Sequence, residues 1–178
     1  MSAVESLPAA RHDARAERPG FAASAARHLD DVYRYLLYLT KDGTLAEDLT
    51  ADTFERALRG WHRFDPRRGS ARTWLCQLAR TTALDHFRAE DRRRSREARY
   101  AREHDEPAAP PELPGLSPEL ERALAALSAA EREVIALRVV LELDGDAAAR
   151  VLGISRTACS TRLSRALQRL QEGVQDDD

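Results

Sequence analysis

The sequence has 178 residues, of which 33% are charged, and its formal net charge is −2. This length suits one ordinary domain or two small ones, and the polar composition predicts a soluble protein. The chain has no run of about 18 apolar residues, which excludes a transmembrane helix. Residues 21–100 hold 16 basic and 12 acidic side chains, whereas residues 101–178 hold 9 basic and 15 acidic ones. A slightly acidic chain can therefore carry a local basic surface that attracts a polyanion.

Residues 1–20 are expected to be a disordered N-terminal tail. They mix acids with arginines and lack the apolar stretch of a secretory signal peptide. The chain has only two cysteines, Cys76 and Cys159, far apart in the sequence and each on an apolar helix face. They are expected to be buried, inert thiols in a cytoplasmic protein.

Three helices are predicted for a first domain over residues 21–100, because apolar residues recur three and four positions apart and strand signals are almost absent. The second helix has Thr44 as a plausible N-cap, with Glu47 at capping-box spacing. The break "RFDPRRGSA" precedes the third helix, which is expected to start at about Thr73. The residues expected to face the core are Ala22, Ala26, Leu29, Val32, Tyr33, Leu36 and Leu37, then Leu45, Leu49, Phe54, Ala57, Leu58 and Trp61, then Leu75, Leu78, Ala79, Ala83 and Phe87.

The third helix, "RTWLCQLARTTALDHFRAEDRRR", ends in a cluster of arginines. Trp74 fits its apolar stripe and is expected to anchor the core. Asp85 and His86 have no third catalytic partner, so Asp85 is interpreted as structural or ion-paired.

Residues 101–116 are rich in proline and acids and are predicted to form a flexible linker. Helical patterning resumes at Ser117, an N-cap followed by Pro118, and Ser128 has Glu131 at capping-box spacing. The second domain is expected over residues 117–172, with an acidic tail at 173–178. The predicted fold class is all-α, with two small helical domains joined by a flexible linker.

A helix-turn-helix is the most specific local pattern, in "GDAAARVLGISRTACSTRLSRALQRL". Asp144 or Asp146 can cap a short helix, Gly153 permits a tight turn, and Ser155 can cap the next helix. That helix is apolar at Ala158, Cys159, Leu163, Ala166, Leu167 and Leu170. The other side of this helix carries short hydroxyl side chains and arginines, which suit a helix that enters the DNA major groove. The alternative is an ordinary helical hairpin, which would also have a solvated face with arginines.

Three segments and the helix-turn-helix, taken in chain order, resemble the extracytoplasmic-function (ECF) sigma factors of bacterial RNA polymerase. The three segments are "AEDLTADTFERAL", "ARTWLCQLARTTALDHFRAEDRRR" and "LSAAEREVIALRVV". The resemblance implies a region 2-like domain that binds core polymerase and the −10 promoter element. It also implies a region 4-like domain that binds the −35 element. The implied partners are the clamp coiled coil of the largest polymerase subunit, the polymerase flap and promoter DNA.

The resemblance also assigns site residues. Opening the −10 element requires arginines for the phosphates and pockets for unstacked bases, which the loop 64–71 and the following helix would supply. The candidates for core polymerase are Glu47, Asp48, Asp52 and Glu55. Those for the −10 element are Arg67, Arg68, Arg72, Thr81, Arg88, Arg92, Arg93 and Arg94. Those for the −35 element are Arg156, Thr157, Ser160, Thr161, Arg162, Ser164 and Arg165.

Several positions depart from the common pattern of the family. Ala51 stands where glutamine is frequent, Thr81 where asparagine is common, and Ser160 where a lysine or arginine is frequent. Gly145 and Ala148 replace larger residues in the short helix. Losing one base contact costs about 1–3 kcal/mol in discrimination, so the −35 preference stays open.

No catalytic residue, metal or cofactor is expected, so the chain is not expected to be an enzyme. Two alternatives remain: a stand-alone helix-turn-helix regulator whose N-terminal helices dimerise, and a polymerase-binding adaptor without initiation activity. A metal-dependent nuclease is disfavoured, because the carboxylates follow exposed helix spacing.

The linker would also permit an anti-sigma factor to clamp between the two domains, as in many relatives, and no membrane contact is expected.

Overall fold

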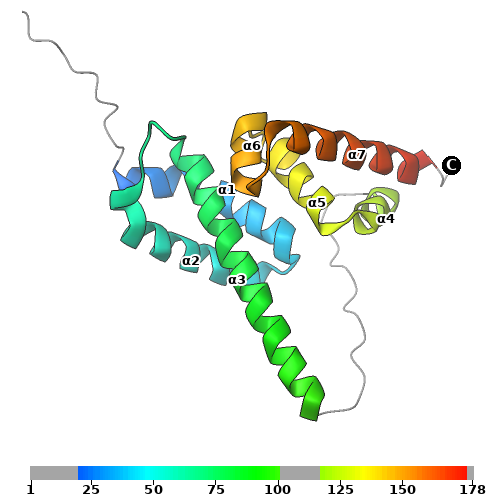
Figure 1. The fold of residues 1–178 in the computed structure, drawn as a ribbon, viewed down its shortest axis with the longest axis horizontal. Helices are drawn as coiled ribbons and strands as arrows, with labels where there is room; N and C mark the ends of the chain where they lie inside the picture. The colour runs from blue at the N-terminus through cyan, green and yellow to red at the C-terminus, as the bar shows by residue number, and fades with distance from the viewer. Residues whose placement is uncertain (1–19, 101–116, 176–178) are drawn as a thin grey trace, which may run out of the picture.

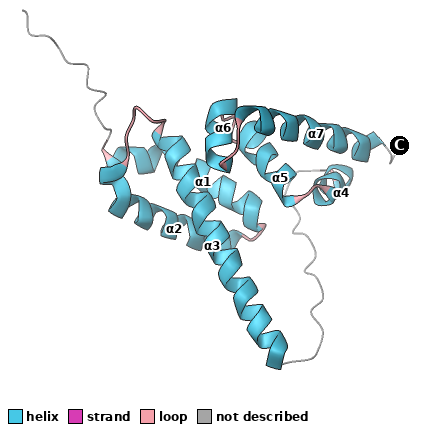
Figure 2. Cartoon of the chain, viewed as in Figure 1, coloured by secondary structure: helices cyan, strands magenta, loops and turns pink. Residues whose placement is uncertain are grey.

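The computed structural model describes residues 20–100 and 117–175. Over these residues the chain forms helices and connecting turns without any strand, which confirms the all-α class (Figures 1 and 2). The predicted linker and nearly all of the predicted N-terminal tail lie outside the described residues. The expected domain boundaries therefore stay predictions.

The N-terminal group of helices contains α1 (Phe21–Thr40), α2 (Gly43–Gly60), the short 3-10 helix η1 (Trp61–Arg63) and α3 (Ala71–Tyr100). Helices α1, α2 and α3 each pack against the other two. The first half of α3 crosses this group, and its C-terminal part projects away from the rest of the molecule (Figure 1).

The C-terminal group contains α4 (Pro118–Ala126), α5 (Ala129–Ile135), the π-helix η2 (Ala136–Val140), α6 (Gly145–Leu152) and α7 (Arg156–Gln175). Helices α4, α5 and α6 all pack against α7, and α6 also packs against α3 of the N-terminal group. Helix α7 continues three residues into the stretch expected to be a tail.

The predicted caps of α4 and α5 are confirmed. The Ser117 hydroxyl accepts a hydrogen bond from the Leu120 N–H at 3.3 Å, with Pro118 in the first turn. Ser128 and Glu131 form the complete capping box at the start of α5. These contacts satisfy backbone N–H groups that have no partner within the helix.

The helix-turn-helix frame is also confirmed. Of the two candidate caps of α6, Asp144 is the one used, and its carboxylate accepts from the Ala147 N–H at 2.8 Å. Gly153 ends α6 with a φ of 68°, a left-handed conformation that glycine adopts without strain. The Ser155 hydroxyl then accepts from the Ala158 N–H at 3.1 Å and begins α7.

The start of α2 differs from the prediction. Asp42, not Thr44, is the cap, and its carboxylate accepts from the Leu45 N–H at 3.0 Å. Lys41 ends α1 in the left-handed region with a φ of 56°. Because only Lys41 and Asp42 separate the two helices, the cap of α2 must lie earlier than Thr44.

The buried face of α1 is rotated relative to the predicted one. Val32 and Leu36 are buried as expected, but Leu29 is 49% exposed and Tyr35, which was not assigned to the core, is fully buried. Ala22 and Ala26 are exposed as well. The reason is that α1 packs against the π-helix η2 of the C-terminal group as well as against α2 and α3.

Three other core assignments are wrong. Leu58 on α2 is 59% exposed, and Leu167 and Ala158 on α7 are exposed. In α3 the prediction is confirmed: Leu75, Ala79 and Ala83 are buried, while Leu78 and Phe87 pack partly buried against them. The helical period locates an apolar stripe, but the neighbouring helices decide which edge of that stripe they cover.

Candidate functional site

Helix α7 presents its polar residues outward. Of the seven candidate −35 residues only Arg162 is half-buried, and the other six are exposed. Cys159 and Ala166 are buried on the opposite face and hold the helix to the domain. The structure therefore brings all seven candidates together on one helix.

A groove of about 570 Å³ lies between the start of α5 and the start of α7. Four of the −35 candidates line this groove and so share one concave surface: Thr157, Thr161, Arg162 and Arg165. Arg156 lies nearby and pairs with Asp146 at 3.2 Å, an exposed contact that leaves the guanidinium in solvent.

The loop before α3 is supported by an aromatic cluster. Trp61 stacks on Phe64 with ring centroids 4.8 Å apart, and Trp74 packs edge-on against Trp61 at 5.6 Å. Trp74 thus packs against the hydrophobic core, as predicted. The Ser70 hydroxyl accepts from the Thr73 N–H at 3.1 Å, so α3 begins at Ala71 rather than at Thr73.

A cavity of about 420 Å³ opens between this loop and α6. Arg63 and Arg68 line it from the N-terminal group and Arg150 lines it from α6, with Asp65 as the one acidic lining residue. The sequence reasoning missed Arg150, and no local pattern identifies it, because its position in the cavity depends on how the two groups of helices pack.

Arg72 has a structural contact. Its Nε and Nη2 donate to the two carboxylate oxygens of Asp31 at 2.7 and 3.0 Å, and both side chains are largely buried. This fork ties the start of α3 to α1. Arg67 and Arg68, the neighbouring candidates, are exposed in the loop.

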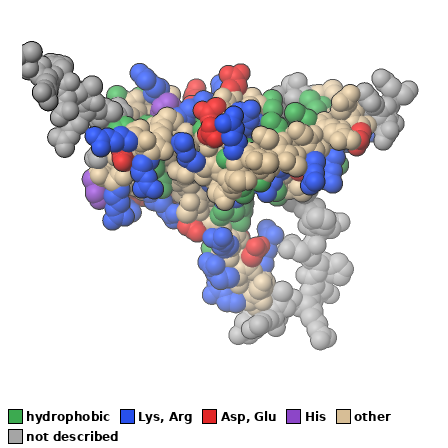
Figure 3. All heavy atoms as spheres, turned by 45° about the horizontal axis from the view of Figure 1, so that its top comes forward, with side chains coloured by type: hydrophobic (Ala, Val, Ile, Leu, Met, Phe, Trp, Pro, Cys, Tyr) green, Lys and Arg blue, Asp and Glu red, His purple; other side chains and the backbone are tan. Residues whose placement is uncertain are grey.

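The other −10 candidates lie further along α3. Arg88, Arg92, Arg93 and Arg94 are exposed, and blue side chains gather on the projecting end of the helix in Figure 3. Arg88 and Arg93 are 3.6 and 3.0 Å from Asp85 and Glu90 respectively. At a rise of about 1.5 Å per residue, Arg72 and Arg92 are roughly 30 Å apart. The structure thus separates the −10 candidates into a loop group and a helix-end group, with the exposed Thr81 between them.

Helix α2 carries an exposed acidic face formed by the core polymerase candidates Glu47, Asp48, Asp52 and Glu55. Beside it, between α1 and α2, runs a mainly apolar groove of about 570 Å³ whose lining includes Leu29, Tyr33, Ala51 and Phe54. The sequence reasoning missed this groove because it assigned Leu29 to the core.

The carboxylates near the middle of α3 serve ion pairs. Asp85 lies 3.2 Å from Arg56 of α2, as well as near Arg88 on its own helix. In the part of the chain that the structure describes, no group of three or more His, Cys, Asp or Glu side chains could hold a metal ion.

Both cysteines are buried and unpaired. Burial raises the pKa of the Cys76 thiol to about 12 and also raises the pKa of Cys159. Both thiols are therefore protonated at neutral pH and unreactive. Among residues 20–100 and 117–175, no helix is long and apolar enough to cross a bilayer.

Comparisons with known proteins agree with this geometry. The family models of sigma-70 region 2 and sigma-70 region 4 match residues 25–93 and 117–170. The probable RNA polymerase sigma-C factor of Mycobacterium bovis is 35% identical over 150 residues, covering 83% of this chain and 80% of that protein. The ECF RNA polymerase sigma factor SigM of Bacillus subtilis is 31% identical over 159 residues, covering 84% of this chain and 94% of that protein.

A solved structure gives the same answer for the fold. The sigma factor RpoE, in complex with the anti-sigma factor NepR from Bartonella quintana, matches with a TM-score of 0.67 at 26% identity, covering 89% of this chain and 98% of that one. The two groups of helices are thus a region 2 domain and a region 4 domain, and the chain belongs to the ECF RNA polymerase sigma factors.

Proposed function

We propose that this sigma factor divides promoter recognition between its two domains. In this proposal the region 2 domain spans 21–100 and the region 4 domain 117–172. The region 2 domain binds core RNA polymerase and the −10 element, and the region 4 domain binds the −35 element. The observation that carries the proposal is the exposed polar face of α7, held by the Asp144, Gly153 and Ser155 frame.

Reading of the −35 element is assigned to α7. Ser160, Thr161 and Ser164 are short, so they let the helix backbone approach base edges closely. Arg156 and Arg165 reach further and are suited to guanine edges or phosphates. Because Ser160 occupies a position at which relatives frequently carry a cation, we expect weaker −35 affinity than a basic residue would give.

The two groups of −10 candidates are assigned different roles. Arg67 and Arg68 stand beside the aromatic-supported loop, where unstacked bases would need neighbouring phosphates neutralised. Arg88, Arg92, Arg93 and Arg94 would contact the backbone of adjacent duplex and add salt-dependent affinity without base choice. Arg72, already held by Asp31, would act mainly by positioning the start of α3.

Binding of core polymerase is assigned to α2. Its acidic face suits a basic partner, here the clamp coiled coil of the largest subunit, and the adjacent apolar groove would add area that is buried on binding. The region 4 domain would contact the flap. The sigma factor itself carries out no bond chemistry and works in the cytoplasm, where the polymerase synthesises RNA.

The test combines the purified protein with core polymerase and a genomic promoter library, followed by sequencing of the transcripts. We expect new start sites that share an upstream pair of sequence elements. Stable core binding without any start site would favour an adaptor, and a failure to bind core would contradict the proposal.

Variants of α7 give the matched control. Thr161→Ala should change the preferred −35 sequence or reduce transcription, with loss of about 1–3 kcal/mol in discrimination at one base position. Gln168→Ala, on an exposed position two turns further along the same helix, should leave the preference unchanged.

A further inference from the structure

The cavity between the loop before α3 and helix α6 is rich in arginine. Its volume is about 420 Å³, and its charged lining residues are Arg63, Arg68, Arg150 and Asp65. The Asp65 carboxylate accepts a hydrogen bond from the Arg67 N–H at 3.0 Å, so it serves the backbone of its own loop. Among the residues that the structure describes, Arg68 and Arg150 have no ion pair. The lining therefore has an excess of positive charge that a dianion would neutralise.

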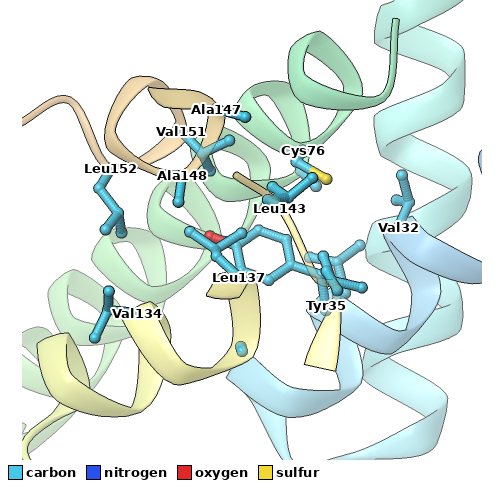
Figure 4. Packing of buried hydrophobic residues seen from close by; sticks show 14 of the residues in the cluster. Val32, Tyr35, Cys76, Val134, Leu137, Leu143, Ala147, Ala148, Val151 and Leu152 are labelled. Atoms are coloured by element: carbon cyan, nitrogen blue, oxygen red, sulfur yellow. The ribbon is translucent and has the colours of Figure 1, made fainter. Parts of the chain in front are cut away.

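The packing of α6 fixes the place of Arg150. Figure 4 shows Ala148 of α6 in the same group of buried side chains as Cys76 of α3. Arg150 lies on the exposed side of α6, and one of its guanidinium nitrogens is 3.0 Å from the position that a Cβ on Gly69 would occupy. Arg150 is thus held beside the residue that directly precedes Ser70.

Ser70 places a hydroxyl group in this cavity. Its side chain is exposed and lines the cavity, and its oxygen lies 2.9 Å from the Thr73 hydroxyl. A phosphate on the Ser70 oxygen would carry about −1.5 to −2 charges and would lie opposite the arginine cluster. In such a setting a phosphoserine gains charge-assisted hydrogen bonds from guanidinium groups.

The sequence before Ser70 suits a protein kinase. Arg67 and Arg68 stand three and two residues before it, and Ser95 is the only other serine or threonine of the sequence with arginines at both places. Paired arginines are a charge pattern by which a kinase with an acidic substrate cleft selects a serine. Residues 64–70 are not helical and can enter such a cleft as an extended segment, whereas Ser95 lies within α3.

We propose that Ser70 is a phosphorylation site and that Arg63, Arg68 and Arg150 bind the phosphate. The catalyst is an arginine-directed serine/threonine kinase, and the phosphoryl donor is ATP. The Ser70 oxygen forms a bond to the γ-phosphorus while the bond between that phosphorus and the bridging oxygen breaks. ADP leaves, and a base of the kinase takes the hydroxyl proton.

The modification would act on the DNA-binding loop. Arg68 is assigned to the −10 element, so a phosphate on Ser70 competes with the DNA backbone for this arginine and repels the DNA phosphates. This effect rests on the promoter function proposed above. The modification itself and its contact with the arginines do not.

The first experiment locates the modified residue. The purified full chain is treated with magnesium ATP and the catalytic subunit of cyclic-AMP-dependent protein kinase, which selects serines after paired arginines, and mass spectrometry identifies the phosphorylated peptides. We expect Ser70 to be modified faster than Ser95. Ser70→Asn keeps a residue that caps helices well and should leave only the slower modification. Faster modification at Ser95, or none at Ser70, would overturn the proposal.

The second experiment measures the contact with the arginines. Phosphoserine is incorporated at position 70 during translation of the full chain, and phosphorus NMR follows its titration. Nearby cations favour the dianion, so the pKa of the phosphate should lie about 1 below its ordinary value of roughly 6. Arg150→Gln should move this pKa back toward the ordinary value. Arg59→Gln, at an exposed arginine of α2 outside the cavity, should leave it unchanged. An ordinary pKa in the parent, or equal shifts from both variants, would overturn the arginine contact.

The third experiment tests the effect on DNA. It uses single-stranded DNA that carries the −10 sequence found with the promoter library. The protein with phosphoserine at position 70 should bind this strand roughly tenfold more weakly than the unmodified protein at the same salt concentration. Equal affinities would overturn the competition with DNA. Absence of DNA binding by both forms, with the kinase and NMR results as expected, would contradict the promoter function but support the phosphorylation site.

Discussion

The two domains differ in whether the residues that stabilise the fold are distinct from the residues proposed to contact DNA. On α7, the residues proposed to contact DNA are almost all exposed, and Cys159 and Ala166 hold the helix from the opposite face. On α3, Arg72 and Arg80 lie among the residues proposed to contact the −10 element, yet they bind Asp31 and Glu133. If these residues contact DNA as proposed, we expect a substitution on the outer face of α7 to change promoter choice at little cost in stability. A substitution near the start of α3 should alter both.

The largest effect is expected from the core of the region 2 domain. Leu75→Ala removes a fully buried side chain and should lower the free energy of unfolding by about 2–5 kcal/mol. Leu58→Ala, at a leucine that is 59% exposed, should change it by less than about 0.5 kcal/mol. Urea unfolding followed by circular dichroism measures both, and similar losses would place Leu58 in the core after all.

A smaller loss is expected for Arg72→Ala. It leaves the largely buried Asp31 carboxylate without its forked partner and should cost about 1–3 kcal/mol. Arg68→Ala, in the exposed loop, should leave stability nearly unchanged while weakening binding of single-stranded −10 DNA. If Arg72→Ala weakened DNA binding without destabilising the domain, folding and recognition would be separate on α3 too.

The caps of the region 4 domain come next. Asp144→Ala deletes the N-cap of α6 and should cost about 1 kcal/mol. Asp146→Ala breaks only an exposed ion pair with Arg156, worth roughly 0–1 kcal/mol. Thermal unfolding of the two variants should rank Asp144→Ala as the less stable, and the reverse order would assign the cap to Asp146.

The smallest effect concerns pH. Burial lowers the pKa of His28 below its ordinary 6.5, although Asp31 opposes this shift. The unfolded chain therefore binds a proton at a higher pH than the folded one, so stability should fall as the pH drops below about 6.5. His28→Gln should reduce this slope in urea unfolding at a series of pH values, whereas His62→Gln at an exposed position should retain it.

The sequence predicts the region 4 domain better than the arrangement of α1 and α2. Ser128, Asp144, Gly153 and Ser155 act on backbone groups within a few residues, so their roles are visible in local patterns. The exposure of Leu29 depends instead on which helices cover α1, a property that the helical period does not contain.

The candidate site residues can also be predicted from the sequence only where local patterns determine them. Six of the seven candidate residues of α7 lie on the exposed side of one helix, so their grouping follows from spacing alone. Tyr35 and Glu133 are 98 positions apart, and no local pattern in the sequence indicates that Glu133 contacts Tyr35. Contacts between domains are thus the part that required the structure.

The stability of the projecting end of α3 should depend on ionic strength. Arg88, Arg92 and Arg96 follow one another at steps of four residues, and each pair of like charges at this spacing destabilises a helix by roughly 0.2–0.5 kcal/mol. Residues 91–96 are all exposed, so little burial offsets this repulsion. Salt relieves the repulsion and favours the helical conformation, but it weakens attraction to phosphates. If this end of α3 binds DNA as proposed, the DNA backbone would supply the screening and the attraction together, so binding would also stabilise the helical conformation of this segment.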